Sequence, residues 1–327
     1  MKGKLLRLAV TVFLLALVLS RVDWDDFRRI GAGVRPGLVA IGYALNLVMV
    51  ALNTVRWRVL VNALGVRVSM LRLGSYYFVC MFFNNFMPTS IGGDVIRVID
   101  LARHTGRKTT AMASIVVERL LGLYVLFPLC LGAFFLLRSD LPERRWFLLA
   151  EGGMAAAFFF GTLVIRRRNV RRLEPLLRPF ESGLRRFGLR EKAAGFYDTL
   201  DFYKGRRREV GWALFLSVLS RAVWVVSCWV LGLSIGIDLG PVHFFLLMPL
   251  VEVGRMIPIS LNGMGIREGV LVIVLGLFGT GEAEAVFLSV LVYGIFLING
   301  LLGGVVYGLR GFFDPKPAPE GGRDGTA

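Results

Sequence analysis

Long apolar runs alternate with short polar segments along the chain, and this pattern predicts helices that cross a membrane. The runs at residues 5–20, 38–55 and 120–137 contain no acidic residue. A helix of about twenty mostly apolar residues spans the hydrocarbon core of a bilayer. The third run belongs to a longer predicted helix at 113–137. Further predicted helices cover residues 146–165, 210–237, 242–256 and 286–309. The predicted fold class is therefore all-α, a polytopic integral membrane helical bundle with about eight hydrophobic segments.

One apolar run ends early, at the polar stretch NNFMPTSIGGDVIRVIDLAR (84–103). Basic segments lie on both sides of this run, at 56–72 and 103–108. Basic loops stay on the cytoplasmic side of a membrane, so a helix that crosses once cannot join two of them. We therefore predict a re-entrant hairpin whose tip lies near 84–93. Non-helical backbone at that depth must be buried in protein or line a wet cavity.

A second interrupted stretch, IPISLNGMGIREG (257–269), repeats features of the first. Both run from a proline through a serine and two glycines to an arginine with an acidic neighbour. The matched residues are Pro88, Ser90, Gly92, Gly93, Asp94 and Arg97 in the first stretch, and Pro258, Ser260, Gly263, Gly265, Arg267 and Glu268 in the second. Paired Gly/Pro-interrupted segments in two halves of a transporter indicate a substrate site between its repeats. The two stretches are therefore predicted to form two re-entrant or broken hairpins, in repeat-like halves, around one site.

The backbone and the arginines of these stretches suit a charged lipid headgroup. Proline and glycine break a helix, and helices that begin after Gly93 and Gly265 point their positive ends at whatever lies there. Arg97 and Arg267 add fixed charge, and arginine binds phosphate through two parallel hydrogen bonds. Both stretches are therefore predicted to contact the headgroup.

The carboxylates and amides of the two stretches leave alternatives open. Asp94 and Glu268 either hold the neighbouring arginines in place or bind a cationic headgroup. Neutral donors and acceptors come from Asn84, Asn85, Ser90 and Asn262. In a purely structural alternative, Ser90 or Asn262 caps a kinked helix and the arginines extend to the inner membrane interface.

Ionisable residues also lie inside apolar segments, at Glu118 and Arg119 and at Glu252 and Arg255. Such residues are costly in a membrane and normally face a partner or a cavity. Adjacent residues on a helix do not face each other, so Glu118 and Arg119 are not expected to pair. We hypothesise that Glu118 approaches Arg97 within the bundle.

The charge distribution predicts the sidedness of the chain. The net charge is +16, and residues 166–208 carry fourteen basic and five acidic residues. In a membrane protein such an excess marks the cytoplasmic side, so nucleic acid is not an expected partner. Apolar residues at helical spacing in this segment predict an amphipathic helix on anionic inner-leaflet lipids. Arg221, in the helix at 210–237, is interpreted as an interfacial arginine that reaches the membrane surface.

No motif for catalysis or metal binding is recognised in the chain. Cys80, Cys130 and Cys228 lie in apolar runs without a CxxC pair, and His104 and His243 are isolated. Buried thiols of this kind behave as small apolar residues. Nucleophile-elbow, P-loop and HExxH motifs are missing from the sequence. We therefore expect no metal, no cofactor and no enzymatic activity.

The stretches NNFMPTSIGGDVIR, ERLLGLYVL and IPISLNGMGIREG resemble the transmembrane region of lysylphosphatidylglycerol synthases, the flippase-like domain family. The resemblance implies a polytopic bundle with re-entrant helices that moves an aminoacylated phospholipid between leaflets. The positions that match the family's motifs are Asn84, Pro88, Gly92, Gly93, Asp94, Arg97, Glu118, Arg119, Pro258, Gly263, Gly265, Arg267 and Glu268. The fused synthases carry a soluble synthase domain that this sequence lacks, so the resemblance implies a stand-alone member that does not aminoacylate lipid itself. Stand-alone relatives look like partners of glycosyltransferases or polyprenol-linked pathways.

The expected function is that of a lipid translocase. The expected substrate is a phospholipid, anionic or modified, or a polyprenyl-phosphate carrier. Its headgroup is expected to cross the cytoplasmic (inner) membrane through a polar cavity between the interrupted helices. A non-transporting scaffold for a glycosyltransferase or lipid-modifying enzyme is the alternative. One transmembrane domain is expected at 1–309 and a disordered cytoplasmic tail at 310–327, with both termini cytoplasmic.

Overall fold

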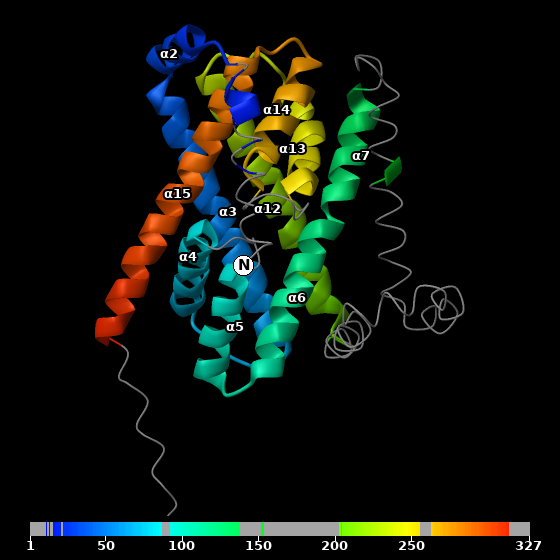
Figure 1. The fold of residues 1–327 in the computed structure, drawn as a ribbon. Helices are drawn as coiled ribbons and strands as arrows, with labels where there is room; N and C mark the ends of the chain where they lie inside the picture. Colours follow the sequence, from blue (N-terminus) through cyan, green and yellow to red (C-terminus); the bar gives the residue numbers. More distant parts are fainter. Residues whose placement is uncertain are drawn as a thin grey trace, which may run out of the picture.

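The computed structural model describes residues 16–20, 22–86, 92–137, 205–255 and 263–313, with isolated positions 11, 13, 152, 153 and 203. All regular structure in these ranges is helical (Figure 1), which confirms the all-α fold class. The helix predicted at 146–165, most of the basic segment at 166–208 and the tail beyond 313 lie outside the described residues. Most of the helix predicted at 5–20 lies outside them too.

The helices lie in the order α2 (Trp24–Gly33), α3 (Pro36–Ala63), α4 (Met70–Phe86), α5 (Gly92–Thr105), α6 (Lys108–Tyr124), α7 (Leu126–Leu137), α12 (Arg207–Ser234), α13 (Pro241–Arg255), α14 (Ile266–Gly276) and α15 (Glu282–Phe313). Four helical stretches are long and apolar enough to cross a membrane: α3, α6 continued by α7, α12 and α15. They match the helices predicted at 38–55, 113–137, 210–237 and 286–309.

Two of the membrane-length helices extend beyond their predicted ends. α3 was expected to end near residue 55 but continues to Ala63. No glycine or proline occurs between Gly42 and Gly65, and the chain turns only at Gly65, where φ is 75°. α15 runs to Phe313, so its last residues fall in the segment predicted as a disordered tail.

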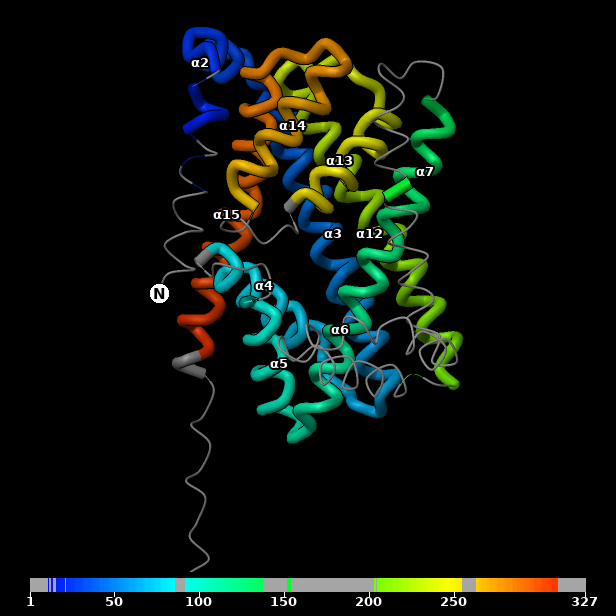
Figure 2. The backbone as a smooth tube through the Cα atoms, turned by 45° about the vertical axis from the view of Figure 1, so that its right-hand side comes forward, coloured from blue at the N-terminus to red at the C-terminus, as the bar shows by residue number. Residues whose placement is uncertain are grey.

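Four shorter helices form two pairs in opposite halves of the bundle. α4 packs on α5 in the lower half, and α13 packs on α14 in the upper half (Figures 1 and 2). These helices contain 11 to 17 residues and reach only about 17–26 Å, short of the roughly 30 Å hydrocarbon core. The helix predicted at 242–256 corresponds to α13, which ends at Arg255 after roughly 22 Å, and α14 leads back to the same end of the bundle. That either helix pair enters the bilayer and returns to the same face stays a prediction.

The α4–α5 pair is held along one side by α15. A Cβ atom at Gly303 would overlap the carbonyl oxygen of Phe78, so glycine permits the close approach of α15 to α4. Near the end of α15, Arg310 donates a hydrogen bond to Asp100 of α5 at 3.1 Å. The residues of α4 just before Phe86 are half-buried, and the first turn of α5, at Gly92, Gly93 and Asp94, is buried.

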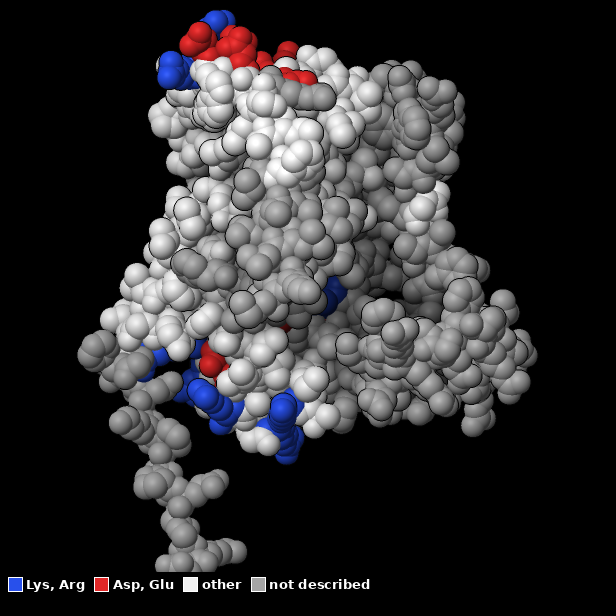
Figure 3. Space-filling view, in the orientation of Figure 1, with Lys and Arg blue, Asp and Glu red and all other residues white. Residues whose placement is uncertain are grey.

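Among the described residues on the face shown in Figure 3, charged side chains gather at the two ends, and few are visible between them. Asp23 and Asp25 are exposed at the α2 end. Arg103, Arg107 and Lys108 are exposed at the turn between α5 and α6, at the opposite end. This distribution is the one expected of a chain whose middle lies in lipid.

Candidate functional site

Three arginines and two carboxylates form one ion network where α3, α5 and α6 meet. Glu118 accepts hydrogen bonds from Arg56 Nη2 at 2.8 Å and from Arg97 Nη2 at 2.5 Å. Asp94 pairs with Arg97 at 3.4 Å and also with Arg119. The hypothesis that Glu118 approaches Arg97 is confirmed. Asp94 holds arginines in place, which was the first of its two alternatives.

Aromatic rings fix the position of Arg97 further. Its guanidinium carbon lies 4.0 Å from the ring centroid of Trp57 and 4.6 Å from that of Tyr77. Trp57 in turn donates its indole N–H to Ser114 Oγ at 3.1 Å. A desolvated contact between a cation and an aromatic face contributes about 2 kcal/mol. Residues of α3, α4 and α6 therefore hold this buried charge in one place.

Gly93 lets the start of α5 lie against α4. A Cβ atom at this position would overlap the carbonyl oxygen of Cys80 and lie 2.7 Å from Asn84 Oδ1. Asn84 Oδ1 accepts the N–H of Gly93 at 2.8 Å. The first turn of α5, with Asp94, is thereby held inside the bundle.

A second cluster lies at the start of α14. Gly265 has a φ of 82° and precedes the helix, and its N–H donates to Glu268 Oε2 at 2.7 Å. Glu268 Oε1 accepts hydrogen bonds from Arg267 and, at 3.0 Å, from Ser289 Oγ. The Arg267 guanidinium lies 5.0 Å from the ring centroid of Tyr293. Glu268, like Asp94, holds a neighbouring arginine.

Both clusters open onto one interior cavity of about 270 Å³. Side chains from α3, α4, α5, α6, α12, α13, α14 and α15 line it. Of the predicted site residues, the lining includes Asn84, Asn85, Asp94, Arg97, Glu118, Arg119, Glu252 and Arg267. The structure therefore brings both interrupted stretches and the central motif together at one place.

The remaining predicted residues lie beside the cavity or outside the described part of the chain. Those that flank the lining and shape the helix starts are Gly92, Gly93, Gly263, Gly265 and Glu268. Those outside the described residues are Pro88, Ser90, Pro258, Ser260, Asn262 and the side chain of Arg255. Because α14 begins at Ile266 after Gly265, the alternative in which Asn262 caps this helix is wrong.

Several lining residues were not predicted as site residues, namely Arg56, Tyr77, Ser220, Arg221, Trp224 and Tyr293. The interfacial interpretation of Arg221 is wrong. Its side chain is 26% exposed and lies in the cavity, with Nη1 3.9 Å from Glu252 Oε1. α12 begins at Arg207, so Arg221 lies about four turns inside the helix.

The signal for Arg56 was present in the spacing of polar residues. Asn46, Asn53 and Arg56 follow one another at intervals of seven and three, which places them on one face of a helix. All three are buried. Arg58, two residues after Arg56, points away from that face and is exposed.

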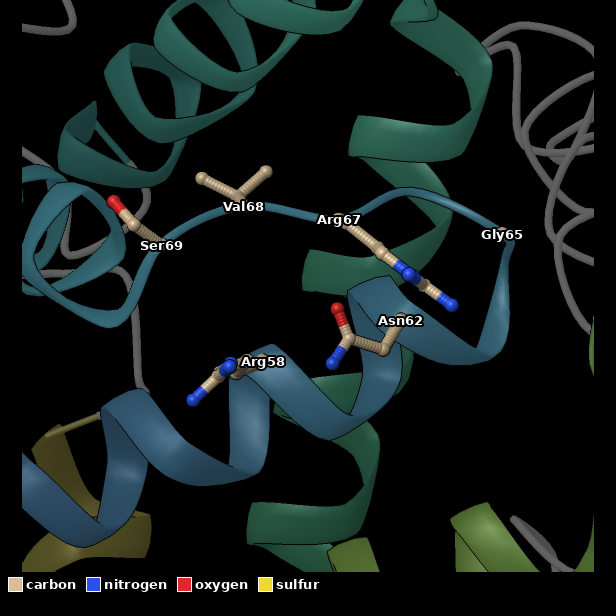
Figure 4. A pocket seen from close by; sticks show the side chains of 6 residues that line it. All are labelled: Arg58, Asn62, Gly65, Arg67, Val68 and Ser69. Carbon is tan, nitrogen blue, oxygen red and sulfur yellow. The ribbon is translucent and has the colours of Figure 1, made fainter.

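A second hollow, of about 790 Å³, lies at the surface beside the end of α3. It is lined by Arg58, Asn62, Gly65, Arg67, Val68 and Ser69 (Figure 4). Apart from the buried Val68, its residues are exposed, and none belongs to the predicted site. This hollow therefore offers arginines that are separate from the interior cavity.

Within the described ranges, no group of three or more His, Cys, Asp or Glu side chains is placed to hold a metal ion. The carboxylates of the cavity are instead engaged with arginines.

An all-helical chain with membrane-length helices around a charged interior cavity is a polytopic membrane protein. The chain belongs to the family of lysylphosphatidylglycerol synthase transmembrane regions, whose family model matches residues 4–304. The resemblance noted in the sequence is thus confirmed over almost the whole length.

Two archaeal proteins of similar length resemble the chain. A UPF0104 membrane protein of Methanothermobacter thermautotrophicus is 24% identical, with 93% of this chain and 92% of the relative covered. Another UPF0104 membrane protein, from Methanocaldococcus jannaschii, is 19% identical, with 89% of each chain covered. No solved structure matches the chain significantly.

Proposed function

We propose that this protein is a lipid translocase that moves a polar headgroup through the interior cavity while the acyl or prenyl chains stay in the surrounding lipid. The observation that carries the proposal is the concentration of charge at the cavity. Arg56, Arg97 and Glu118 are each at most 5% exposed, yet they lie among helices of membrane length. Intramembrane ionisable residues mark substrate pathways, because a charge in lipid is costly unless it has a function or a partner.

The arrangement of the short helices supports a transport role. The ends of α4 and α5 and the ends of α13 and α14 meet the cavity from opposite halves of the bundle. Transporters commonly bind their substrate near the middle of the membrane, between broken helices that belong to two repeats. Such a site can be reached from either side when one pair of helices moves relative to the other.

The surface charge supports one orientation. The exposed basic residues Arg103, Arg107 and Lys108 lie at the α5–α6 turn, whereas at the α2 end the exposed Arg28 and Arg29 are paired with Asp25 and Asp26. The basic end is proposed to face the cytoplasm, because cytoplasmic loops carry the excess of Lys and Arg. The proposed location is the cell membrane, and the proposed activity involves no chemical change of the lipid.

The proposal is tested by lipid exchange in liposomes that contain the purified chain. Phospholipids with a natural headgroup and a fluorophore on one short acyl chain are incorporated, and a membrane-impermeant reductant then bleaches those in the outer leaflet. Wild-type protein should allow bleaching beyond the outer-leaflet half, and Arg267→Ala should slow this phase at least tenfold. Arg58→Ala, a change in the surface hollow of Figure 4, is the matched control and should leave the rate unchanged.

The same experiment separates transport from a scaffold role. If wild-type liposomes lose only the outer-leaflet half of the signal, the translocase function is wrong and the scaffold alternative stands. If Arg267→Ala liposomes exchange lipid at the wild-type rate, lipid does not pass through this cavity. Size-exclusion profiles of each purified variant establish that it is folded before it is reconstituted.

A further inference from the structure

The charges that line the cavity are unbalanced. Five arginines and three carboxylates contribute to the lining. Including Glu268, which pairs with Arg267 beside the cavity, one positive charge is in excess among the described residues. Charges in a largely buried cavity are most stable when opposite charges match them, so this excess favours an anionic ligand.

Two buried donors at the cavity have no acceptor. The Nε–H groups of Arg56 and Arg97 make no hydrogen bond, although both side chains are more than nine-tenths buried. Both arginines line the cavity and share the carboxylate of Glu118. A buried charged donor without an acceptor is costly. Both Nε atoms are closed off from the cavity, so these two arginines contribute positive potential and are not ligand contacts.

The carboxylates of the cavity have arginine partners. Glu118 has two and Asp94 has two, while Glu252 lies 3.9 Å from Arg221. A cationic headgroup would have to displace an arginine from one of these pairs and would add to a positive charge that is already in excess. The electrostatics of the cavity therefore oppose a positively charged ligand.

The volume of the cavity limits the size of its ligand. At about 30 Å³ for each water molecule, 270 Å³ holds roughly nine waters. The cavity volume is slightly below roughly 300 Å³, the lower end of the range for pockets that bind drug-sized ligands. One phosphate with a small substituent fits, and a long oligosaccharide does not.

We propose that the cavity binds the phosphate of an anionic lipid with a small headgroup, that Arg119 and Arg221 contact it, and that lipids of net positive charge are excluded. This inference rests on the translocase function proposed above. Arg119 and Arg221 are chosen because their side chains are 38% and 26% exposed, so a ligand in the cavity can reach them. Arg56 and Arg97, which are more deeply buried, supply the surrounding positive potential.

Binding to the purified full-length chain in non-ionic detergent tests this inference, with tryptophan fluorescence as the signal, because Trp224 lines the cavity. The probes are dihexanoyl phosphatidylglycerol, which is anionic, dihexanoyl ethylphosphatidylcholine, which is cationic, and inorganic phosphate. The anionic lipid should bind at least tenfold more tightly than either of the others. Arg119→Gln and Arg221→Gln should each weaken its binding about tenfold, whereas Arg58→Gln should change it by less than twofold.

The inference is overturned if the cationic lipid binds as tightly as the anionic one, or if both cavity variants bind the anionic lipid like wild type. Equal affinity for inorganic phosphate would show a phosphate site and not a lipid site. In liposomes, equal exchange rates for anionic and cationic lipids would refute the charge selection and leave the translocase function standing. Selective binding without any lipid exchange would instead support the anionic site and refute the translocase function.

Discussion

Replacing Glu118 by glutamine should strongly destabilise the protein, because this carboxylate neutralises two buried arginines. Its side chain is 3% exposed, and its oxygens lie 2.8 Å from Arg56 Nη2 and 2.5 Å from Arg97 Nη2. Glutamine keeps the shape but removes the charge. Arg97 then retains Asp94 at 3.4 Å, whereas Arg56 retains only the neutral Ser217 hydroxyl at 3.1 Å. One buried guanidinium is left without a counterion.

The cost of breaking a buried ion pair from one side is about 3–5 kcal/mol. Each kcal/mol lowers Tm by roughly 2–4 °C in domains of 150–250 residues and by less in a chain of 327, so Glu118→Gln should lower Tm by roughly 5–10 °C. The Tm is measured in detergent by size-exclusion chromatography after heating. Asp25→Asn is the matched control: its pair with Arg28 spans 3.7 Å at more than 80% exposure, so the Tm should change by no more than a few degrees.

A double variant distinguishes the loss of charge balance from a packing defect. Arg56→Gln combined with Glu118→Gln removes the unpaired guanidinium together with its partner, so it should melt above Glu118→Gln alone. If Glu118→Gln melts within 2 °C of wild type, the stability of the ion network does not depend on the negative charge of Glu118. If the double variant melts no higher than Glu118→Gln, the uncompensated charge of Arg56 is not the cause of the destabilisation.

Three further predictions follow from single side chains. Gly93→Ala should lower the Tm by several degrees, because its Cβ would overlap the Cys80 carbonyl oxygen, while Gly269→Ala, with open space around it, should not. Gly122→Leu should slow lipid exchange about tenfold by filling the cavity, whereas Gly122→Ala should not, since a Cβ there meets its nearest neighbour only at 3.4 Å. Burial raises the pKa of Tyr203, so as the pH rises the unfolded chain loses the Tyr203 proton before the folded chain does. The free energy of unfolding should therefore fall above about pH 10, and Tyr203→Phe should flatten that fall in a pH series of Tm values.

The positions of the interrupted helices could be predicted from the sequence because breakers act locally. Gly92 and Gly93 open α5, and Gly265 precedes α14, as the glycine pairs indicated. The basic segments around the first stretch likewise indicated that the chain returns to the same end. The Glu118–Arg97 pair could be hypothesised because each residue carries a charge that the apolar segments cannot leave unpaired.

The partners from other helices could not be predicted in the same way. Arg56 lies in an RWR triplet that reads as the basic end of a membrane helix, and only the continuation of α3 to Ala63 places it inside the bundle. Arg221 is predicted at the membrane interface because it is read as lying close to the start of its helix, and the other helices that form the cavity beside it are far away in the sequence. Which arginine of such a segment faces inward depends on packing between helices, and a single sequence carries only the weak signal of polar spacing.

The ends of the short helices explain why recognition in this cavity depends on side chains. The positive ends of α5 and α14 were predicted to contact the headgroup, yet the Gly93 N–H is bonded to Asn84 Oδ1 and the Gly265 N–H to Glu268 Oε2. Both helix starts thus have acceptors from within the protein, and a carboxylate at α14 already offsets part of the positive end. The arginines that reach the cavity are therefore the stronger attraction for an anion. Asn84→Ala should expose the α5 start without adding charge to the cavity, and it should loosen the α4–α5 contact more than it changes the preference for anionic lipid.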